Sequence, residues 1–112
     1  MKSNTIEPSV AHVLHDLISP TEQGISSRVL AQNGGGNMTL FSFDEGQKLS
    51  EHSAPFDALV MVLEGKLNLV IDGKPVAATP GTLVKMPANI PHSVDALEAS
   101  RMLLVMLREP QK

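Results

Sequence analysis

Two histidines stand at the two ends of the most strongly patterned stretch of this 112-residue chain. His52 comes shortly after the turn-forming residues 44–46, and His92 comes directly after the proline-flanked loop 87–91. Near neutral pH an imidazole can act as a general base, orient a polar ligand or bind a transition metal. The sequence therefore offers a two-histidine site, on condition that the fold brings together two rings that are forty residues apart.

The stretch between the histidines is typical of a β-hairpin. Residues 59–63 and 67–71 are runs of β-branched and long apolar residues, closed by Glu64-Gly65 and Asp72-Gly73. The second run alternates with period two, and the Asp-Gly pair supplies the positive φ angles that a tight reversal needs. We therefore expect strands, paired as a hairpin, in the segment that separates the two imidazoles.

The rest of the chain favours many short strands. Further runs of strand character, separated by Gly and Pro turns, lie at residues 25–32, 37–43, 76–79, 82–86, 93–97 and 100–107. About eight to ten strands at such spacings are typical of a sandwich or a barrel. Residues 11–18 favour a short strand or one to two helical turns, docked on the sheet or on a partner, and residues 1–10 favour a loose arm. We expect a single all-β domain over residues 1–112.

The composition argues against several classes of protein. The chain has no cysteine, which rules out disulfides and thiolate metal sites and suits a reducing compartment, so we expect a cytoplasmic location. We see no secretory signal, and no apolar run reaches the roughly 18 residues of a membrane span. The net charge is −3, Lys and Arg do not cluster, and three Phe are the only aromatic residues. We therefore expect neither a nucleic acid nor a membrane as partner.

Two segments resemble the paired motifs of the cupin superfamily, whose members are small jelly-roll barrels of two β-sheets. The first family motif runs Gly, five residues, His-x-His, three or four residues, Glu, six residues, Gly. The second runs Gly, five residues, Pro-x-Gly, two residues, His, three residues, Asn. The matching residues of this chain are Gly46, His52 and Gly65 for the first motif and Gly81, Pro87 and His92 for the second. The resemblance covers residues 24–107 and implies an all-β double-stranded β-helix, the jelly-roll barrel of a small RmlC-like cupin.

Four positions depart from the family pattern. The second His and the Glu of the first motif fall on Ala54 and Ala58, and the second Gly and the Asn of the second motif fall on Asn89 and Ala96. The family's usual metal site of three His and one Glu is thus reduced to His52 and His92. Because catalytic metals usually have at least three protein ligands, two imidazoles alone hold Fe, Mn, Ni or Zn poorly. We favour two neutral histidines in an apolar pocket and keep a divalent metal as the alternative.

The predicted ligand pocket follows from the alternation of side chains along the strands of a barrel. If His52 points inward under unbroken pleating, Ala54 and Ala58 do so too, and their small size leaves room for a ligand. We expect the pocket to be lined by His52, His92, Ala54, Ala58, Phe41, Phe43 and Met86. Glu51 and Asp57 lie one residue out of phase, so a β-bulge would have to turn one of them inward. Asp57 could equally cap the turn after Pro55 through its backbone.

Four further polar side chains have a weaker case as functional groups. His12 and His15 would share a helix face and could hold a metal, although exposure on the surface is far more common. Arg28 and Arg101 fall in predicted strands and could meet an anionic ligand if they point inward. Outward, solvated placement is the default for both arginines.

Three functions remain open at this point. We favour a module that binds a small organic molecule near His52 and His92. The second function is that of a metal-dependent cupin enzyme, a dioxygenase or an isomerase of a small organic acid, which needs a third metal ligand. The third is a structural or interaction role with a vestigial site. Long apolar strands with exposed edges predict a homodimer, in which a second chain would cover these edges. The resemblance to small cupins, which are similar to one another in how they pair, also implies a homodimer.

Overall fold

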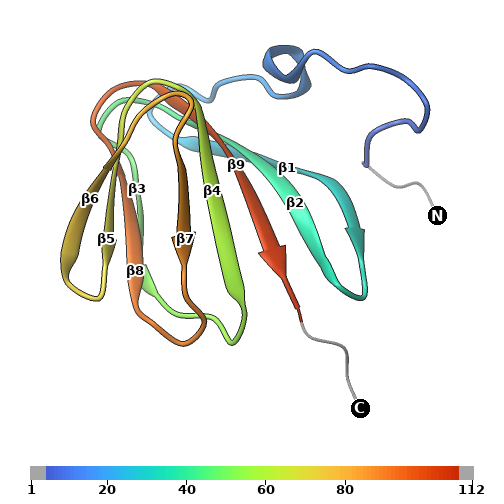
Figure 1. The fold of residues 1–112 in the computed structure, drawn as a ribbon. Coiled ribbons are helices and arrows are strands. Elements are labelled where there is room, and N and C mark those ends of the chain that lie inside the picture. Colours follow the sequence, from blue (N-terminus) through green and yellow to red (C-terminus); the bar gives the residue numbers. More distant parts are fainter. Residues whose placement is uncertain (1–4, 109–112) are drawn as a thin grey trace.

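The computed structural model describes residues 5–108, in which nine strands form two antiparallel sheets that face each other (Figure 1). The larger sheet has the strand order β1-β2-β9-β4-β7 and the smaller sheet the order β3-β8-β5-β6. The strands are β1 (Ile25–Asn33), β2 (Gly36–Phe43), β3 (Lys48–His52), β4 (Asp57–Glu64), β5 (Leu67–Ile71), β6 (Lys74–Ala78), β7 (Leu83–Met86), β8 (His92–Ala96) and β9 (Ser100–Leu107). This is the all-β jelly-roll architecture that the sequence predicts.

The space between the two sheets is filled by side chains that alternate along the strands. Val60 and Val62 of β4 and Leu67 and Leu69 of β5 are each at most 1% exposed and belong to one continuous apolar cluster. Full burial of such a side chain contributes about 1.5–3 kcal/mol to stability. The two strands with the strongest apolar patterns therefore form the centre of the barrel.

The predicted hairpin between the histidines is correct in its strands and wrong in its pairing. β4 pairs with β7 and β9, whereas β5 pairs with β6 and β8 in the other sheet. The turn at Glu64-Gly65 carries the chain from one sheet to the other. Each of the two strands has a row of apolar side chains, and both rows are buried because the strands pack face to face in opposite sheets. The hairpin of this region is β5–β6, and its turn residues Asp72 and Gly73 have φ angles of 52° and 77°.

A second apolar cluster lies on the outer face of the larger sheet, under the N-terminal segment. Leu30, Leu40 and Leu103 form its buried sheet side, and Ile18 covers them together with the partly buried Leu17. Residues 14–17 form a 3-10 turn, η1 (Leu14–Leu17), rather than a strand. The segment docks on the chain's own sheet; of the predicted loose arm, residues 1–4 lie outside the described residues.

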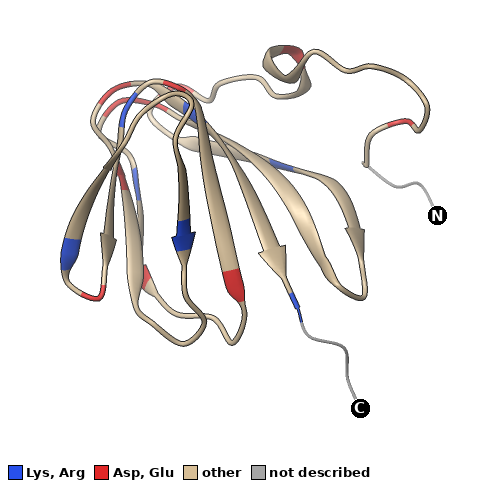
Figure 2. Cartoon of the chain, viewed as in Figure 1, with Lys and Arg blue, Asp and Glu red and all other residues tan. Residues whose placement is uncertain are grey.

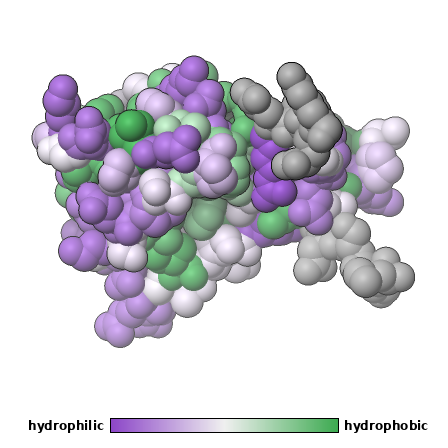
Figure 3. Space-filling model, turned by 90° about the horizontal axis from the view of Figure 1, so that it is seen from below, coloured by the Kyte–Doolittle hydropathy of each residue, from purple (hydrophilic) through white to green (hydrophobic). Residues whose placement is uncertain are grey.

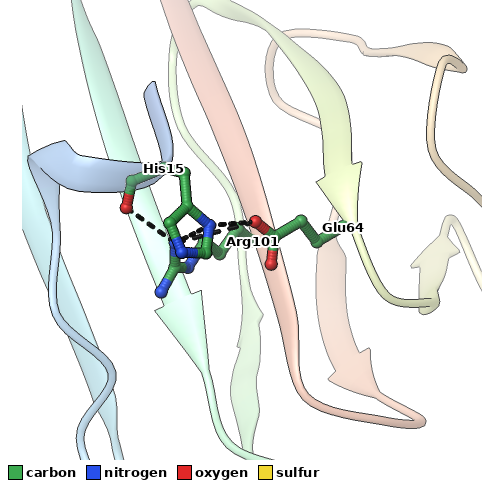
Figure 4. A network of polar contacts seen from close by, with 3 residues as sticks. All are labelled: His15, Glu64 and Arg101. Carbon is green, nitrogen blue, oxygen red and sulfur yellow. Dashed lines mark hydrogen bonds and ion pairs between the residues drawn. The ribbon is translucent and has the colours of Figure 1, made fainter. Parts of the chain in front are cut away.

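The docked segment is held by two arginines on the outer face of the larger sheet. Arg101 donates from Nη1 to the carbonyl oxygen of His15 at 2.7 Å, and Arg28 donates from Nη1 to the carbonyl oxygen of Leu17 at 3.0 Å. Glu64 joins this network, with Oε1 at 2.6 Å from His15 Nδ1 and 3.6 Å from Arg101 Nη1 (Figure 4). The expectation of solvated arginines is wrong for Arg101, which is 8% exposed because the N-terminal segment covers it.

The surface of the described chain carries no large patch of one charge. Lys and Arg lie scattered over turns and strand ends, interspersed with Asp and Glu (Figure 2). None of the helices in residues 5–108 is long and apolar enough to cross a membrane. The expectation that nucleic acid is not a partner stays a prediction.

We predict that Gly65→Ala destabilises the protein more than Gly73→Ala does. Both glycines have positive φ, 82° and 77°, so an L side chain costs about 1–2 kcal/mol at either position. An added methyl at Gly65 would also collide with the Ala99 carbonyl and the Ser100 hydroxyl, whereas at Gly73 it would meet nothing within 4 Å. Urea unfolding of both variants measures the difference, and equal losses of stability would contradict the close packing at Gly65.

Candidate functional site

The rings of His52 and His92 meet at one end of the barrel. The two residues face each other in the β3–β8 pair, with ring centroids 4.5 Å apart and an interplanar angle of 70°. His92 is 6% exposed and shares the interior face of β8 with the buried Val94, whereas His52 is exposed. One imidazole therefore closes the apolar interior and the other borders on solvent.

A β-bulge in β3 makes this meeting possible. Leu49 pairs with Val94 and His52 pairs with His92, so three steps along β3 match two steps along β8. The extra residue puts Leu49 and His52 on the same face in spite of their odd spacing. Glu51, which stands next to His52 in β3, is exposed. This bulge lies before His52, so the assumption of unbroken pleating from His52 to Ala58 stays a prediction.

Both imidazoles are bound in the same way through Nδ1. His52 Nδ1 lies 2.8 Å from the carbonyl oxygen of Ser50, and His92 Nδ1 lies 3.1 Å from that of Ile90. A carbonyl oxygen only accepts hydrogen bonds, so Nδ1 carries the proton in each ring and Nε2 of a neutral ring has a free lone pair. Burial lowers the pKa of His92, the Ile90 carbonyl partly offsets this, and the neighbouring His52 lowers the pKa further. Near neutral pH His92 is thus a neutral acceptor.

Three of the predicted lining residues, Ala54, Ala58 and Met86, come to the same end of the barrel as the histidines. Loop 53–56 connects His52 to β4, and loop 87–91 connects Met86 of β7 to His92. Both loops lie at the bottom of Figure 1. Ala58 faces Met86 across the β4–β7 pair, and both side chains are buried. We call this region, with His52, His92, Ala58 and Met86, the histidine end. Seen from this side, the surface shows apolar residues between hydrophilic ones (Figure 3).

The two predicted phenylalanines are not brought to the histidine end. Phe41 and Phe43 stack with ring centroids 6.0 Å apart, and Phe43 is 1% exposed in the core. Phe43 pairs with Ser100 at one end of β9, while Ala58 pairs with Met106 near the other end. Six residues of a strand span about 20 Å. The sequence predicts the phenylalanines in the pocket because it shows that they are aromatic and apolar, but it does not show how far along the strand they lie from the histidines.

Met106 and Asn37 are lining candidates that the sequence reasoning missed. Met106 faces Ala58 on one side and Asn37 on the other, so the row of interior residues continues from β7 and β4 through β9 to β2. Both residues also border an open groove of about 440 Å³ at the free end of the β1–β2 hairpin. Residues 102–107 are all apolar, so the sequence does not show which of them face the interior, and only the pairing of β9 with β4 places Met106 beside Ala58.

Two interloop hydrogen bonds fix the shape of the histidine end. Asp57 Oδ1 accepts from the backbone N–H of Ala88 at 2.9 Å, and the carbonyl of Ala54 accepts from the N–H of Asn89 at 2.7 Å. Asn89 has a φ of 66°, the left-handed conformation for which the family motif uses glycine. The carboxylate of Asp57 thus caps the loop 87–91, and Lys85 lies 3.6 Å from its other oxygen. The sequence left open a role for Asp57 in the turn after Pro55, whereas the contact observed is made by its side chain to the loop 87–91.

The residues present do not fit the metal site that the family pattern implies. Within residues 5–108 no group of three or more His, Asp or Glu side chains could hold a metal ion. The two remaining family positions carry the methyl groups of Ala54 and Ala58, which offer no donor atom. His12 and His15 have other partners, the Glu7 carbonyl and the Arg101–Glu64 pair. Two imidazoles without a third ligand do not make a site for a firmly held catalytic metal.

We predict that His92 makes the folded state less stable at acidic pH. Its folded-state pKa lies below the ordinary value of 6.5, so the unfolded chain takes up the proton first as the pH falls. The contribution of His92 to stability is therefore complete above the unfolded-state pKa of about 6.5 and is lost as the pH falls from there through the lower folded-state pKa. Denaturant unfolding at about pH 7.5 and about pH 5.5 should show a smaller loss for His92→Phe than for the parent chain. An equal loss in both proteins would contradict the assignment.

Comparisons with known proteins agree with this architecture. The family described as Cupin domain matches residues 39–107. No curated protein matches the chain. Among solved structures, a conserved protein of unknown function from Streptococcus pyogenes is 35% identical, with a TM-score of 0.89 over 96% of this chain and 95% of that chain.

Two further solved structures extend the likeness. A cupin 2 conserved barrel domain protein from Leptotrichia buccalis is 38% identical, with a TM-score of 0.80, and the match covers 84% of this chain but 46% of that chain. A cupin superfamily protein from Desulfitobacterium hafniense is 25% identical, with a TM-score of 0.84 over 96% of this chain and 97% of that chain. The family match spans more than half of the sequence and includes both histidines. The chain belongs to the cupin family.

Proposed function

We propose that this protein binds a small organic molecule at the histidine end of its barrel. The observation that carries the proposal is the pair of imidazoles, each with Nδ1 bound to a backbone carbonyl and Nε2 left free, at the edge of an apolar interior. Ligand sites typically combine mostly apolar walls with a few well-oriented polar groups. Ala58, at the family's Glu position, and Met86 supply such a wall.

A metal-dependent dioxygenase or isomerase is the second candidate. It is favoured by the same two imidazoles, because a free Nε2 with Nδ1 bonded to a carbonyl is the form in which histidine binds metals. The lack of a third ligand among the described residues weighs against it. The binding module needs no such ligand, so the geometry supports it better. A vestigial site with a structural role and the cytoplasmic location stay open as further predictions.

The test of the proposed function is a ligand screen with matched histidine variants. Thermal unfolding is followed with a panel of small carboxylates, phenols and aromatic compounds, for the parent chain and for His52→Ala and His92→Ala. A bound ligand raises the melting temperature of the parent protein by mass action. We expect this rise to disappear in both variants and to persist in His12→Ala, whose ring lies on the N-terminal segment and contacts the Glu7 carbonyl.

Metal analysis of protein purified without an affinity tag decides between the two candidates. The binding module predicts Fe, Mn, Ni and Zn well below one ion per chain in the parent and in both histidine variants. Stoichiometric metal that is lost in both variants would overturn the binding module in favour of the enzyme.

We further propose that the chain forms a homodimer through the outer face of the larger sheet. The described part of the N-terminal segment packs on this face over β1, β2, β9 and the Leu63–Glu64 end of β4, whereas Met61 of β4 and Leu83 of β7 are exposed. Met61 and Leu83 face each other there, 40% and 61% exposed, and Met61 adjoins Leu103 on its other side. A contiguous apolar row of this kind favours a partner, and a second copy offers the same row across a two-fold axis.

We predict that Met61→Glu and Leu83→Glu shift the protein towards the monomer. A carboxylate at the centre of an apolar interface must be desolvated without a partner, which disfavours association. Sedimentation at micromolar concentration measures the change. Leu97→Glu is the matched control, because Leu97 is 51% exposed in the connection between β8 and β9 and lies outside this row. A parent protein that sediments as a monomer would refute the dimer.

A further inference from the structure

We infer that Asn33, at the free end of the β1–β2 hairpin, is a site of spontaneous deamidation. In the folded protein its side-chain amide converts to aspartate and to isoaspartate, and the isoaspartate form loosens the end of the hairpin. This chemistry is independent of the ligand proposed for the histidine end. Three features of the turn support it: the residue that follows Asn33, the exposure of that residue, and one hydrogen bond to the reacting side chain.

The first feature is the glycine that follows Asn33. Asparagine is one of the chemically labile residues, and its deamidation begins when the backbone nitrogen of the next residue attacks the side-chain amide carbon. A side chain on that next residue hinders the approach, and Gly34 has none. No other asparagine of the chain has this advantage. Their following residues are Thr5, Met38, Leu69 and Ile90.

The second feature is the accessibility of the attacking nitrogen. β1 ends at Asn33 and β2 begins at Gly36, so Gly34 and Gly35 form the whole connection, and residues 33–35 are exposed. A methyl group added at Gly34 would meet nothing within 4 Å. Within residues 5–108 the N–H of Gly34 has no hydrogen-bond partner that the attack would have to break.

The third feature is a hydrogen bond that prepares the amide for attack. Oδ1 of Asn33 accepts from the backbone N–H of Gly35 at 2.7 Å, so the side chain folds back over the turn as in an Asx-turn. The ring closed by this hydrogen bond contains both reacting atoms, Cγ of Asn33 and the nitrogen of Gly34, which lowers the entropic cost of their encounter. Negative charge develops on Oδ1 during the attack, and the Gly35 N–H stabilises it as an oxyanion-hole donor does.

The reaction consumes water and releases ammonia. The Gly34 nitrogen bonds to Cγ of Asn33, the Cγ–Nδ2 bond breaks, and the proton of the attacking nitrogen leaves with the ammonia, so that a cyclic succinimide remains. Water then opens the ring. Cleavage between Cγ and the nitrogen gives aspartate, and cleavage between the main-chain carbonyl carbon and the nitrogen gives isoaspartate. The net change replaces an amide NH2 by OH, without oxidation or reduction.

The two products differ in their effect on the hairpin. Both place a carboxylate on the rim of the groove of about 440 Å³, which Asn33 lines. Aspartate keeps the acceptor for the Gly35 N–H, whereas isoaspartate adds a methylene to the main chain before Gly34. The lengthened turn no longer fits the pairing of Asn33 with Gly36 or the hydrogen bond of 2.7 Å from the Arg108 N–H to the Gly35 carbonyl.

Tryptic peptide mapping of the full chain, kept folded at physiological temperature in mildly alkaline buffer, tests the site. The peptide of residues 29–48 should gain the small mass that exchange of NH2 for OH gives, and fragment ions should assign it to Asn33 and not to Asn37. Asn68 and Asn89 are internal controls in the same sample, and we expect both to stay intact. Conversion at Asn33 that is no faster than at these two residues would overturn the inference.

A synthetic peptide of residues 29–48 shows whether the folded turn permits the attack. We expect the folded chain to convert at a rate within about tenfold of the rate of the free peptide. A folded chain that stays intact while the peptide converts would show that the turn blocks the reaction, and the inference would fail.

Gly34→Ala isolates the role of the glycine. The added methyl group meets nothing in the folded turn, but it hinders the approach of the nitrogen to Cγ of Asn33, so we expect deamidation to slow severalfold. An unchanged rate would contradict attack by the Gly34 nitrogen.

Amide hydrogen exchange measures the effect on the hairpin. The isoaspartate fraction, separated by chromatography, should exchange faster at the N–H groups of Gly36 and Arg108 than the variant Asn33→Asp, which keeps the normal main chain. Equal exchange in the two proteins would overturn the loosening by isoaspartate.

Discussion

The pairing of β3 with β8 is the constraint on which the rest of the site depends. It sets His52 against His92, and it does so only because an extra residue in β3 restores the phase after Leu49. Shifting a strand by one residue sends every side chain to the other face of the sheet. Without the bulge, His52 would face solvent on the outer side of the barrel and His92 would stand alone at the edge of the core.

The loops around the histidines keep their shape with residues different from those of the family motif. Asn89 adopts the left-handed φ of 66° in place of a glycine, which Asn tolerates better than most residues. Its N–H is bound to the Ala54 carbonyl, so the position that elsewhere supplies a metal-binding imidazole here contributes its backbone. Asp57, a carboxylate five residues after His52, likewise makes a loop contact. The loops at this end of the barrel thus keep their shape, although the side chains that give the family its metal chemistry are different.

Much of the fold could be predicted because its determinants are local. Glycines with positive φ at positions 46, 65 and 81 and the motif histidines stand at spacings that identify the barrel. The facts that escaped prediction depend on pairing between distant segments. The face of the sheet on which His52 lies depends on a bulge in β3 that no residue type predicts. The distance of Phe43 from the site depends on the register of β2 with β9. Arg101 was expected in water, because the docking of residues 14–18 over it is a tertiary contact.

The two alanines at the family's ligand positions have a consequence that reaches beyond the loss of a metal. A bound cation attracts anionic ligands and raises the acidity of groups that coordinate it. With Ala54 and Ala58 in place of the His and the Glu, this end of the barrel lacks two of the four metal ligands of the family pattern. Burial lowers the pKa of His92, so this ring does not replace the positive charge of a cation near neutral pH. The same two substitutions that remove the metal ligands therefore also remove a charge that would attract an anionic ligand to this end of the barrel.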